Sequence, residues 1–465
     1  MRENLTQLSY VIAAVLFILG LRSLTRPDKA RQGMQLAAIG MLLAVCGTLI
    51  HHEIVDYRWI AGGLVVGALI GYPLGMWVPT TALPQRIAMS LSFGALAAVL
   101  VGVSEYYNAL HGTGGIVLDA PHMAALGFEV LLGSLTVTGA LIAFGKLQEV
   151  LPSRPLTFPG QNFANGLLLL IAFALLVLVI IDPTRTSAFY GMIALAALLG
   201  VLMVIPIGGA DMPVVVALLN SYCGLAAAAT GFALGNSILI ICGALDGASG
   251  FLLSILMSKA MNRSFSNVLF GAFGGGAPAA AAVGAGGALP VRSISAEDAA
   301  IQLAYASRVI IVPGYGMAVA QAQHQVRELA ELIEKRGGEV KYAIHPVAGR
   351  MPGHMNVLLA EANVPYDRLY DMDEINGEFP QTDVALVIGA NDVVNPAARE
   401  DKASPIYGMP ILDVDRAKTV IVLKRGMAAG FAGIENLLFH APATSMLFGD
   451  AKASLSKLVS EVKAA

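Results

Sequence analysis

The chain has 465 residues, of which 56% are hydrophobic and only 13% are charged, and its formal net charge is -3. Soluble proteins usually carry about a quarter of their residues as charges, so this composition is that of a membrane protein. The charge balance, with no basic patch that contains aromatic residues, excludes a nucleic-acid partner. The three cysteines all fall in apolar segments, so the sequence predicts neither a disulfide framework nor a cysteine-based metal site.

Charged residues are unevenly spread along the chain. Residues 1–290 hold 12 Lys or Arg and 11 Asp or Glu, whereas residues 291–465 hold 17 and 21. We predict a transmembrane domain at 1–262, a flexible linker of small residues at 263–290 and a soluble domain at 291–465. The soluble part has no cysteine, which suits a reducing compartment.

Apolar stretches long enough to cross a membrane follow one another through the first part. We place them near residues 5–21, 33–50, 59–77, 84–104, 122–144, 164–181, 187–207, 213–233 and 236–258. Loops on one side hold nine Lys or Arg and loops on the other hold three, so the richer side is cytoplasmic. Nine spans then predict a multi-pass protein with its N-terminus outside and its C-terminal domain in the cytoplasm. Close packing against a neighbouring helix is predicted for the third span by its repeated glycines, Gly63, Gly67, Gly71 and Gly75.

Five polar residues of the membrane part are candidates for a proton path. Asp246 lies near the middle of the ninth span, where a bare carboxylate costs about 2.5 kcal/mol or more. His122 and Glu129 are seven residues apart, so they share a helix face and are spaced for a relay through water. Asn220 lies inside the eighth span, and Asp211 lies in the loop before it. A structural interpretation also stands, with Glu129 as a neutral hydrogen-bonding acid and Asp246 in a helix contact with Asn220 or the residue after it.

Beyond residue 290 the pattern changes to strands that alternate with helices. Strands are predicted at 308–312, 339–345, 383–388 and 419–424, and helices from the first strand to about residue 336, at 354–363 and from about residue 452. This alternation predicts a Rossmann-like α/β domain with a parallel, doubly wound sheet.

The first of these strands ends in a glycine turn that opens a helix, which is the pattern of a dinucleotide cradle. Gly314 permits the tight turn, Gly316 lets a diphosphate approach the backbone, and the helix N-terminus faces the phosphates. An ordinary strand, turn and helix without a ligand fits the same pattern. The candidate cofactor residues of this segment are Gly314, Tyr315, Gly316, Met317, Ala318 and Val319.

The charges at the strand ends indicate which dinucleotide binds. The second strand ends without the acid that usually binds the ribose of NAD. A later strand ends in Lys424 and Arg425, two cations suited to the 2′-phosphate of NADP, although a solvated strand end also explains them. Arg350 lies in an irregular stretch with Gly353, where a guanidinium is suited to grip a diphosphate.

Another predicted strand is followed by Gly389, Asn391 and Asp392, at an edge where open α/β sheets bind ligands. Asn391 and Asp392 are the candidate catalytic pair, which would orient a nicotinamide or a ribose, although a turn rich in Asn and Asp explains them nearly as well. Residues 426–433 include Gly430 and Phe431, and this long segment of small residues is predicted to act as a lid.

Together these stretches resemble the β subunit of the proton-translocating NAD(P) transhydrogenase over essentially the whole length. The most distinctive stretches are residues 208–216, 260–264, 313–323, 345–361, 389–398, 424–433 and 446–454. The resemblance implies Re/Si-specific hydride transfer from NADH to NADP+, driven by inward proton flow. It implies NADP(H) on this chain, inverted relative to usual dinucleotide folds, with its diphosphate near Tyr315 and Arg350 and its 2′-phosphate on Lys424 and Arg425. It also implies NAD(H) on a partner α subunit that this chain needs for activity, and a dimer of αβ units in membrane lipid.

The chain departs from the family pattern at three places. Gly426 stands where similar proteins commonly have serine, and Phe431 stands where they often have tyrosine. Some members carry a proton-transferring histidine in the fourth span, but residues 84–104 contain none and Leu91 lies near that place. These departures leave the nucleotide site intact and the proton route open.

Two other classes of protein remain open at this stage. One is a membrane channel or transporter gated by a nucleotide-sensing domain, although the sequence has no potassium-type filter. The other is a quinone-linked dehydrogenase or haem protein, although the adjacent His51 and His52 point to different helix faces. Co-purification with a polypeptide that has its own NAD site would favour the transhydrogenase.

Overall fold

A computed structural model describes residues 2–24, 29–50, 57–79, 82–111, 119–152, 156–208, 211–261, 265, 290–349, 353–402, 404, 406–430 and 432–464. Contacts divide the chain into two compact units, one helical and one α/β. The predicted linker falls almost wholly outside the described residues, as do Arg350 and Phe431. The limits predicted for the three parts of the chain therefore stay predictions.

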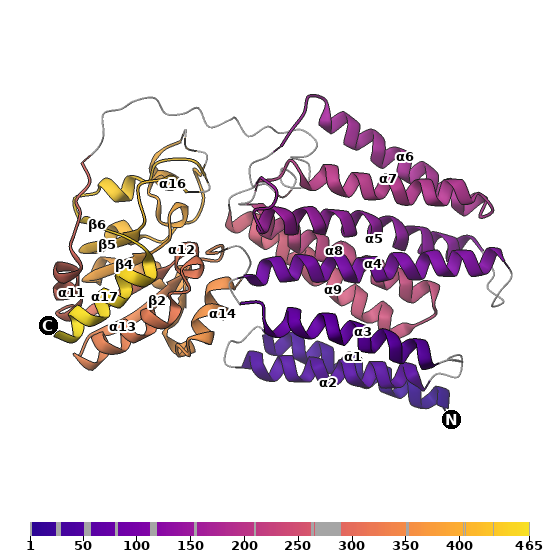
Figure 1. The fold of residues 1–465 in the computed structure, drawn as a ribbon, viewed down its shortest axis with the longest axis horizontal. Helices are drawn as coiled ribbons and strands as arrows, with labels where there is room; N and C mark the ends of the chain where they lie inside the picture. The colour runs from indigo at the N-terminus through magenta and orange to yellow at the C-terminus, as the bar shows by residue number, and fades with distance from the viewer. Residues whose placement is uncertain are drawn as a thin grey trace. The chain divides into compact units, whose positions relative to one another are not determined.

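The helical unit contains, within the described residues, nine helices long and apolar enough to cross a membrane (Figure 1). They are α1 (Arg2–Leu24), α2 (Ala30–Leu49), α3 (Tyr57–Met76), α4 (Leu83–Leu110), α5 (Ala120–Leu147), α6 (Gln161–Ile181), α7 (Thr186–Val204), α8 (Met212–Ala233) and α9 (Ser237–Ala260). Each coincides with one predicted span, so the predicted bundle is confirmed. α5 packs against α4, α6, α7 and α8, while α1 packs against α2.

Glycine allows α8 and α9 to approach each other closely. A Cβ atom on Gly224 of α8 would lie 2.8 Å from the Cα atom of Gly247 in α9. No such contact is found for the glycines of α3, where a Cβ atom at any of the four ladder positions would meet nothing within 4 Å in the described chain. The packing predicted for the α3 ladder is therefore not found within this chain.

The α/β unit is built on a six-stranded parallel sheet with the order β3-β2-β1-β4-β5-β6. The strands are β1 (Arg308–Pro313), β2 (Glu339–Ile344), β3 (Leu369–Asp371), β4 (Val384–Ile388), β5 (Thr419–Lys424) and β6 (Thr444–Phe448). β1 lies between β2 and β4, so the order in which strands are added to the sheet changes direction between β1 and β4. Ligands of open α/β sheets bind at such a switch point. The Rossmann-like fold predicted from the sequence is confirmed.

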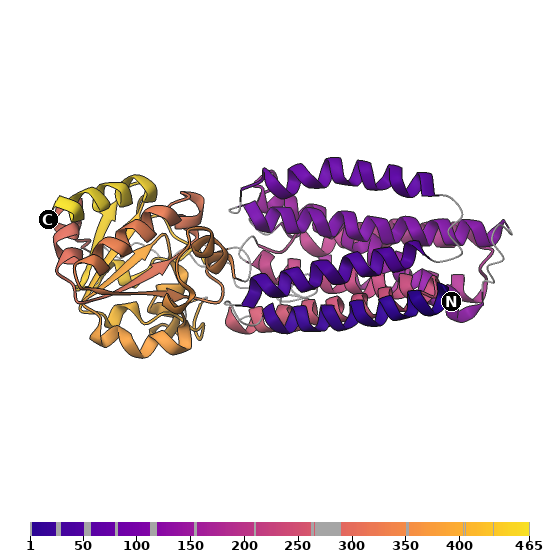
Figure 2. The ribbon, with the colours of Figure 1, turned by 90° about the horizontal axis from the view of Figure 1, so that it is seen from below.

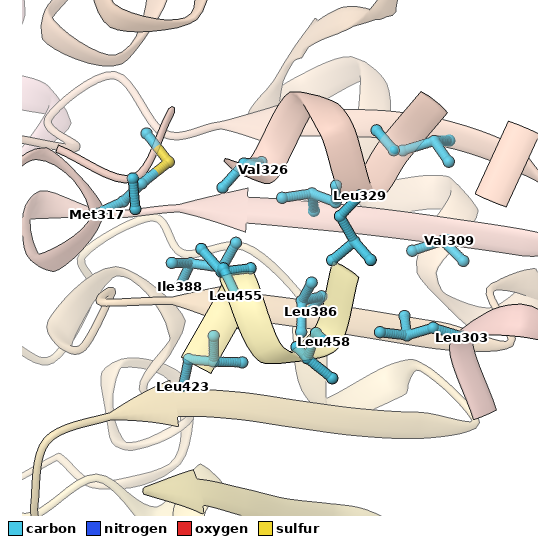
Figure 3. Close-up of a cluster of buried hydrophobic side chains, with 14 of the residues drawn as sticks. Leu303, Val309, Met317, Val326, Leu329, Leu386, Ile388, Leu423, Leu455 and Leu458 are labelled. Atoms are coloured by element: carbon cyan, nitrogen blue, oxygen red, sulfur yellow. The ribbon is translucent and has the colours of Figure 1, made fainter. Parts of the chain in front are cut away.

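Alternate side chains of the strands fill a core on each face of the sheet. Ile311, Leu386 and Leu423 point to one face, which is covered by α11 (Ala296–Ala304), α13 (Gln323–Lys335), α14 (His354–Glu361) and α17 (Ala451–Ala464). Figures 1 and 2 show these helices on the sheet, and Figure 3 shows the side chains packed between α13, α17 and the strands. The other face is covered by shorter elements that include α15 (Met372–Ile375) and the 3-10 helix η8 (Leu437–His440).

One local prediction is wrong. The single helix expected after the glycine turn is two helices, α12 (Tyr315–Val319) and α13, because Gln321 takes a φ of +50° between them. A residue in this left-handed region ends a right-handed helix. Residues 371–375 form the end of β3 and α15, and α15 packs on the sheet because Met372 and Ile375 are buried in the core.

Candidate functional site

The glycine turn at the end of β1 lies directly against the end of β4. Gly314 N donates a hydrogen bond to Ile388 O and Gly316 N donates one to Gly389 O, each at 2.9 Å. A Cβ atom on Gly316 would lie 2.7 Å from Gly389 Cα, and Gly389 has a φ of +64° that favours glycine. The packing of the two turns therefore requires these glycines, independently of any diphosphate.

The turn offers fewer free backbone donors than the sequence pattern implies. Besides the two bonds to the end of β4, Met317 N donates to Gly314 O at 3.1 Å. α12 has only five residues, so it contributes a small dipole. A diphosphate at this turn would depend on the shape of the backbone and on nearby cations more than on a helix N-terminus.

Asn391 and Asp392 lie where β4 ends, and both contact the segment predicted to be a lid. Asp392 Oδ2 accepts a hydrogen bond from Ala432 N at 3.0 Å. A Cβ atom on Gly430 would lie 2.5 Å from Asp392 Oδ1 and 2.9 Å from Asn391 Nδ2. The described part of the lid segment therefore lies directly over these two side chains, while Phe431 is outside the described residues.

Lys424 contacts the other end of the same segment. Its Nζ donates a hydrogen bond to the carbonyl of Ala428 and lies 5.0 Å from the centroid of the Phe439 ring. Burial lowers the pKa of Lys424, and the nearby carboxylate of Asp392 opposes that shift. Arg425 is exposed beside it. The structure thus brings Lys424, Asp392 and the lid segment together at the ends of β4 and β5.

A cavity of about 290 Å³ lies at the ends of β2 and β3, on the side of β1 opposite to β4. Burial lowers the pKa of His345 to about 4, and burial together with Glu374 raises the pKa of Asp371. Gly353 lies in the wall of this cavity with a φ of +67°. The cavity is lined by Ile344, His345, Pro346, Ala348, Gly353, His354, Met355, Asn356, Asp371, Met372 and Asp373.

In the membrane helices, the structure brings Asn220 and Asp246 together. Asn220 Nδ2 donates a hydrogen bond to Asp246 Oδ1 at 2.9 Å, which joins α8 to α9 at the level where Ser221 Oγ also donates to Gly247 O at 2.8 Å. Asp246 is exposed on the surface of this chain. The helix contact expected for Asp246 is therefore present.

Glu129 occupies a different environment from Asp246. Its side chain is 0% exposed on α5, and a Cβ atom on Gly102 of α4 would lie 3.4 Å from its carboxyl carbon. His122 lies in the first turn of the same helix, where its backbone N donates to Asp119 Oδ1 at 3.0 Å. Asp211 immediately precedes α8. Glu129 and His122 thus share α5, whereas Asn220 and Asp246 belong to the contact between α8 and α9.

Comparison with known proteins decides between the possible classes. A family model described as NAD(P) transhydrogenase beta subunit matches residues 6–461. Two relatives named NAD(P) transhydrogenase subunit beta, both from Rhodospirillum rubrum, are each 51% identical to this chain over 461 residues, which is 99% of this chain and 99% of theirs. The chain belongs to the NAD(P) transhydrogenase beta subunit family. This membership implies an alpha subunit as partner, and it replaces the interpretations as a gated channel or a quinone-linked dehydrogenase.

Sequence reasoning missed two buried asparagines of this transhydrogenase subunit. Asn395 and Asn436 are 0% and 1% exposed, and both connect the end of β4 to the residues that follow the lid segment. Neither belongs to a dinucleotide motif, so motif spacing gave no signal for them. Their only sign in the sequence is an asparagine beside apolar residues, in Val394-Asn395 and Asn436-Leu437.

Proposed function

We propose that this beta subunit supplies the NADP(H) site and much of the proton path of a proton-translocating, Re/Si-specific transhydrogenase. Hydride passes between NAD(H) on the alpha subunit and NADP(H) on this chain, and inward proton flow drives transfer from NADH to NADP+. The observation that carries the proposal is the placement of Lys424 and Arg425 at the end of β5, beside a loop that also contacts Asp392.

The dinucleotide extends along one edge of the sheet in this proposal, from the end of β5 across β4 and β1 toward β2. The 2′-phosphate binds Lys424 and Arg425, and the diphosphate crosses the glycine turn of β1 with Arg350 beside it. Gly353 lines the cavity at the end of β2, where this path along the sheet edge ends. Asn391 and Asp392 orient the ribose or the nicotinamide from the end of β4.

Protons cross the helical unit past polar side chains in the same proposal. The support is the hydrogen bond between Asn220 and Asp246 and the complete burial of Glu129, since ionisable groups within spans usually mark ion or proton pathways. His122 and Asp211 stand nearer the ends of the helices.

The asymmetry of basic residues between loops supports a periplasmic N-terminus and a cytoplasmic α/β unit in a bacterial inner membrane, where the enzyme acts as a dimer of alpha-beta units in lipid.

The nucleotide assignment is tested by replacing the two cations. Each charge-assisted hydrogen bond to a phosphate is worth about 1.5 to 3 kcal/mol, so K424A/R425A should erase most of the preference for NADPH over NADH. Titration calorimetry on the purified enzyme measures that preference. The matched control is Lys418→Ala, which removes a cation just before the other end of β5, where it pairs with Asp383 at 2.8 Å, and should leave the preference unchanged. An unchanged preference in the double mutant would show that the 2′-phosphate binds elsewhere.

A further inference from the structure

Asn436 has every polar atom of its side chain bonded to the protein. It is 1% exposed, and its Oδ1 accepts a hydrogen bond from Leu438 N at 2.9 Å. Its Nδ2 donates to two oxygens of Asn391, the backbone O at 3.0 Å and the side-chain Oδ1 at 3.1 Å. Because an amide carries its donor and acceptor on opposite sides, the N–H of Leu438 fixes which way the Asn436 amide faces.

The same constraint passes on to Asn391. Its Oδ1 is occupied by Asn436, so its Nδ2 is directed to the opposite side, under the lid segment. A Cβ atom on Gly430 would lie 2.9 Å from Asn391 Nδ2 and 2.5 Å from Asp392 Oδ1, so an amide donor and a carboxylate acceptor stand side by side there. A flipped Asn391 amide would place a second acceptor beside Asp392 and leave no donor.

We infer that Asn436 is a positioning residue of the NADP(H) site, which orients the Asn391 amide so that its N–H faces the dinucleotide beside the carboxylate of Asp392. A donor next to an acceptor recognises a group that both accepts and donates, which is chemistry shared by a ribose hydroxyl and a nicotinamide carboxamide. The inference rests on the proposed function, because it takes the ligand of this site to be NADP(H).

Asn395 provides a matched control within the same two segments. It is 0% exposed, its Oδ1 accepts from Ala397 N at 3.1 Å and its Nδ2 donates to Glu435 O at 3.1 Å. It therefore joins the end of β4 to the segment after the lid, as Asn436 does. None of these bonds involves the side chain of Asn391, so Asn395 does not set the orientation of that amide.

The test compares Asn436→Asp with Asn395→Asp in the complete enzyme of alpha and beta subunits. Asn436→Asp keeps the acceptor for Leu438 N but turns the donor into an oxygen that faces two acceptors of Asn391. We expect the Kd for NADPH, from titration calorimetry, to rise about tenfold, while Asn395→Asp changes it by less than about twofold at a comparable loss of Tm. In an Asn391→Ala background, the added Asn436→Asp should weaken NADPH binding no further, because the amide through which it acts is gone.

Equal weakening of NADPH binding by the two aspartate variants would overturn the inference, and so would additive losses in the double mutant. If Asn436→Asp does not fold, Asn436→Ser removes the amide donor without adding a charge and is compared in the same way. A wild-type enzyme that binds NADPH no more tightly than NADH would instead contradict the proposed function, and with it the ligand that this inference assumes.

Discussion

His345 shows how burial sets the charge of a side chain beside the candidate site. Its ring is 2% exposed, Nε2 lies 2.8 Å from Pro410 O, and Nδ1 accepts a hydrogen bond from Val347 N at 3.2 Å. The bond accepted by Nδ1 places the ring proton on Nε2, which donates to the carbonyl. Burial lowers the pKa of His345 to about 4, and the bond to Pro410 opposes that shift. The imidazole is therefore neutral at physiological pH, and its role in the cavity wall is to fix the loop after β2.

The depressed pKa of His345 predicts a loss of stability in acid. The pKa in the folded state lies below the usual 6.5, so the stabilisation is complete above pH 6.5 and is lost as pH falls toward 4, by about 3 kcal/mol in all. We expect the Tm of the α/β unit to fall over that range, and His345→Gln, which keeps a donor for Pro410, to reduce the fall. His324→Gln, on the exposed side of α13, is the control. An equal fall in wild type and in His345→Gln would contradict this origin of the acid sensitivity.

The two membrane acids lead to a prediction about proton transfer. Asp246→Asn keeps a hydrogen-bonding partner for Asn220 and Glu129→Gln keeps the volume of the buried side chain, yet neither variant can carry a proton. We expect both to abolish proton pumping by vesicles that hold both subunits and to leave NADP(H) binding unchanged. Asp119→Asn, which preserves the N-cap of α5, should pump normally. Full pumping by the two variants would remove these acids from the proton path.

At the scale of elements, the contact between α8 and α9 depends on glycines with no room for a side chain. A Cβ atom on Gly224 would lie 2.8 Å from Gly247 Cα, and this contact sits one turn from the bond between Asn220 and Asp246. Close approach of backbones through small residues is a common basis of helix packing in membranes. A change that separates α8 from α9 at these glycines should therefore also break the hydrogen bond between Asn220 and Asp246.

A bulky residue at this contact should separate the helices. We expect Gly224→Leu to lower the Tm of the detergent-purified chain by several degrees or to prevent its folding, since overpacking costs about 1 to 3 kcal/mol. Gly67→Leu makes the same change on α3, where a Cβ atom would meet nothing within 4 Å in the described chain, and should be tolerated. The packing account fails if the two variants lower the Tm equally.

Element prediction from the sequence succeeded where one physical property dominates. The nine spans were found within a few residues because length and apolar composition define them. β5 was predicted at its observed limits because Thr419 to Leu423 is a continuous β-branched and apolar run that ends at Lys424. β3 and β6 were missed. β3 has only three residues and pairs only with β2, so its assignment depends on a neighbour that local sequence does not reveal.

At the scale of the whole molecule, the candidate site draws on strands far apart in the sequence. The ends of β1, β4 and β5 were each identified by composition, and the parallel sheet brings them to one edge as predicted. The bonds of Lys424 to Ala428 and of Asn436 to Asn391 were not predicted, because they depend on how the lid segment folds back over the sheet. The sequence thus suggested the charged and glycine positions of the candidate site but not the buried amides behind them.

The number of dinucleotide motifs in the chain bears on which subunit binds which nucleotide. The chain has a single glycine turn of the dinucleotide type, at the end of β1, so it can hold only one of the two nucleotides in this manner. Direct hydride transfer needs donor and acceptor atoms about 3 to 3.5 Å apart. In the proposed function, the alpha subunit therefore brings NAD(H) to the NADP(H) that this chain would hold.

The most direct test of this account is an assay of the purified chain with and without its alpha subunit. NADPH binding and NADH-dependent reduction of NADP+ are measured on the same preparation. We expect the chain alone to bind NADPH in preference to NADH and to show no transhydrogenation, and we expect the added alpha subunit to restore hydride transfer. Sustained transhydrogenation by the chain alone would contradict it.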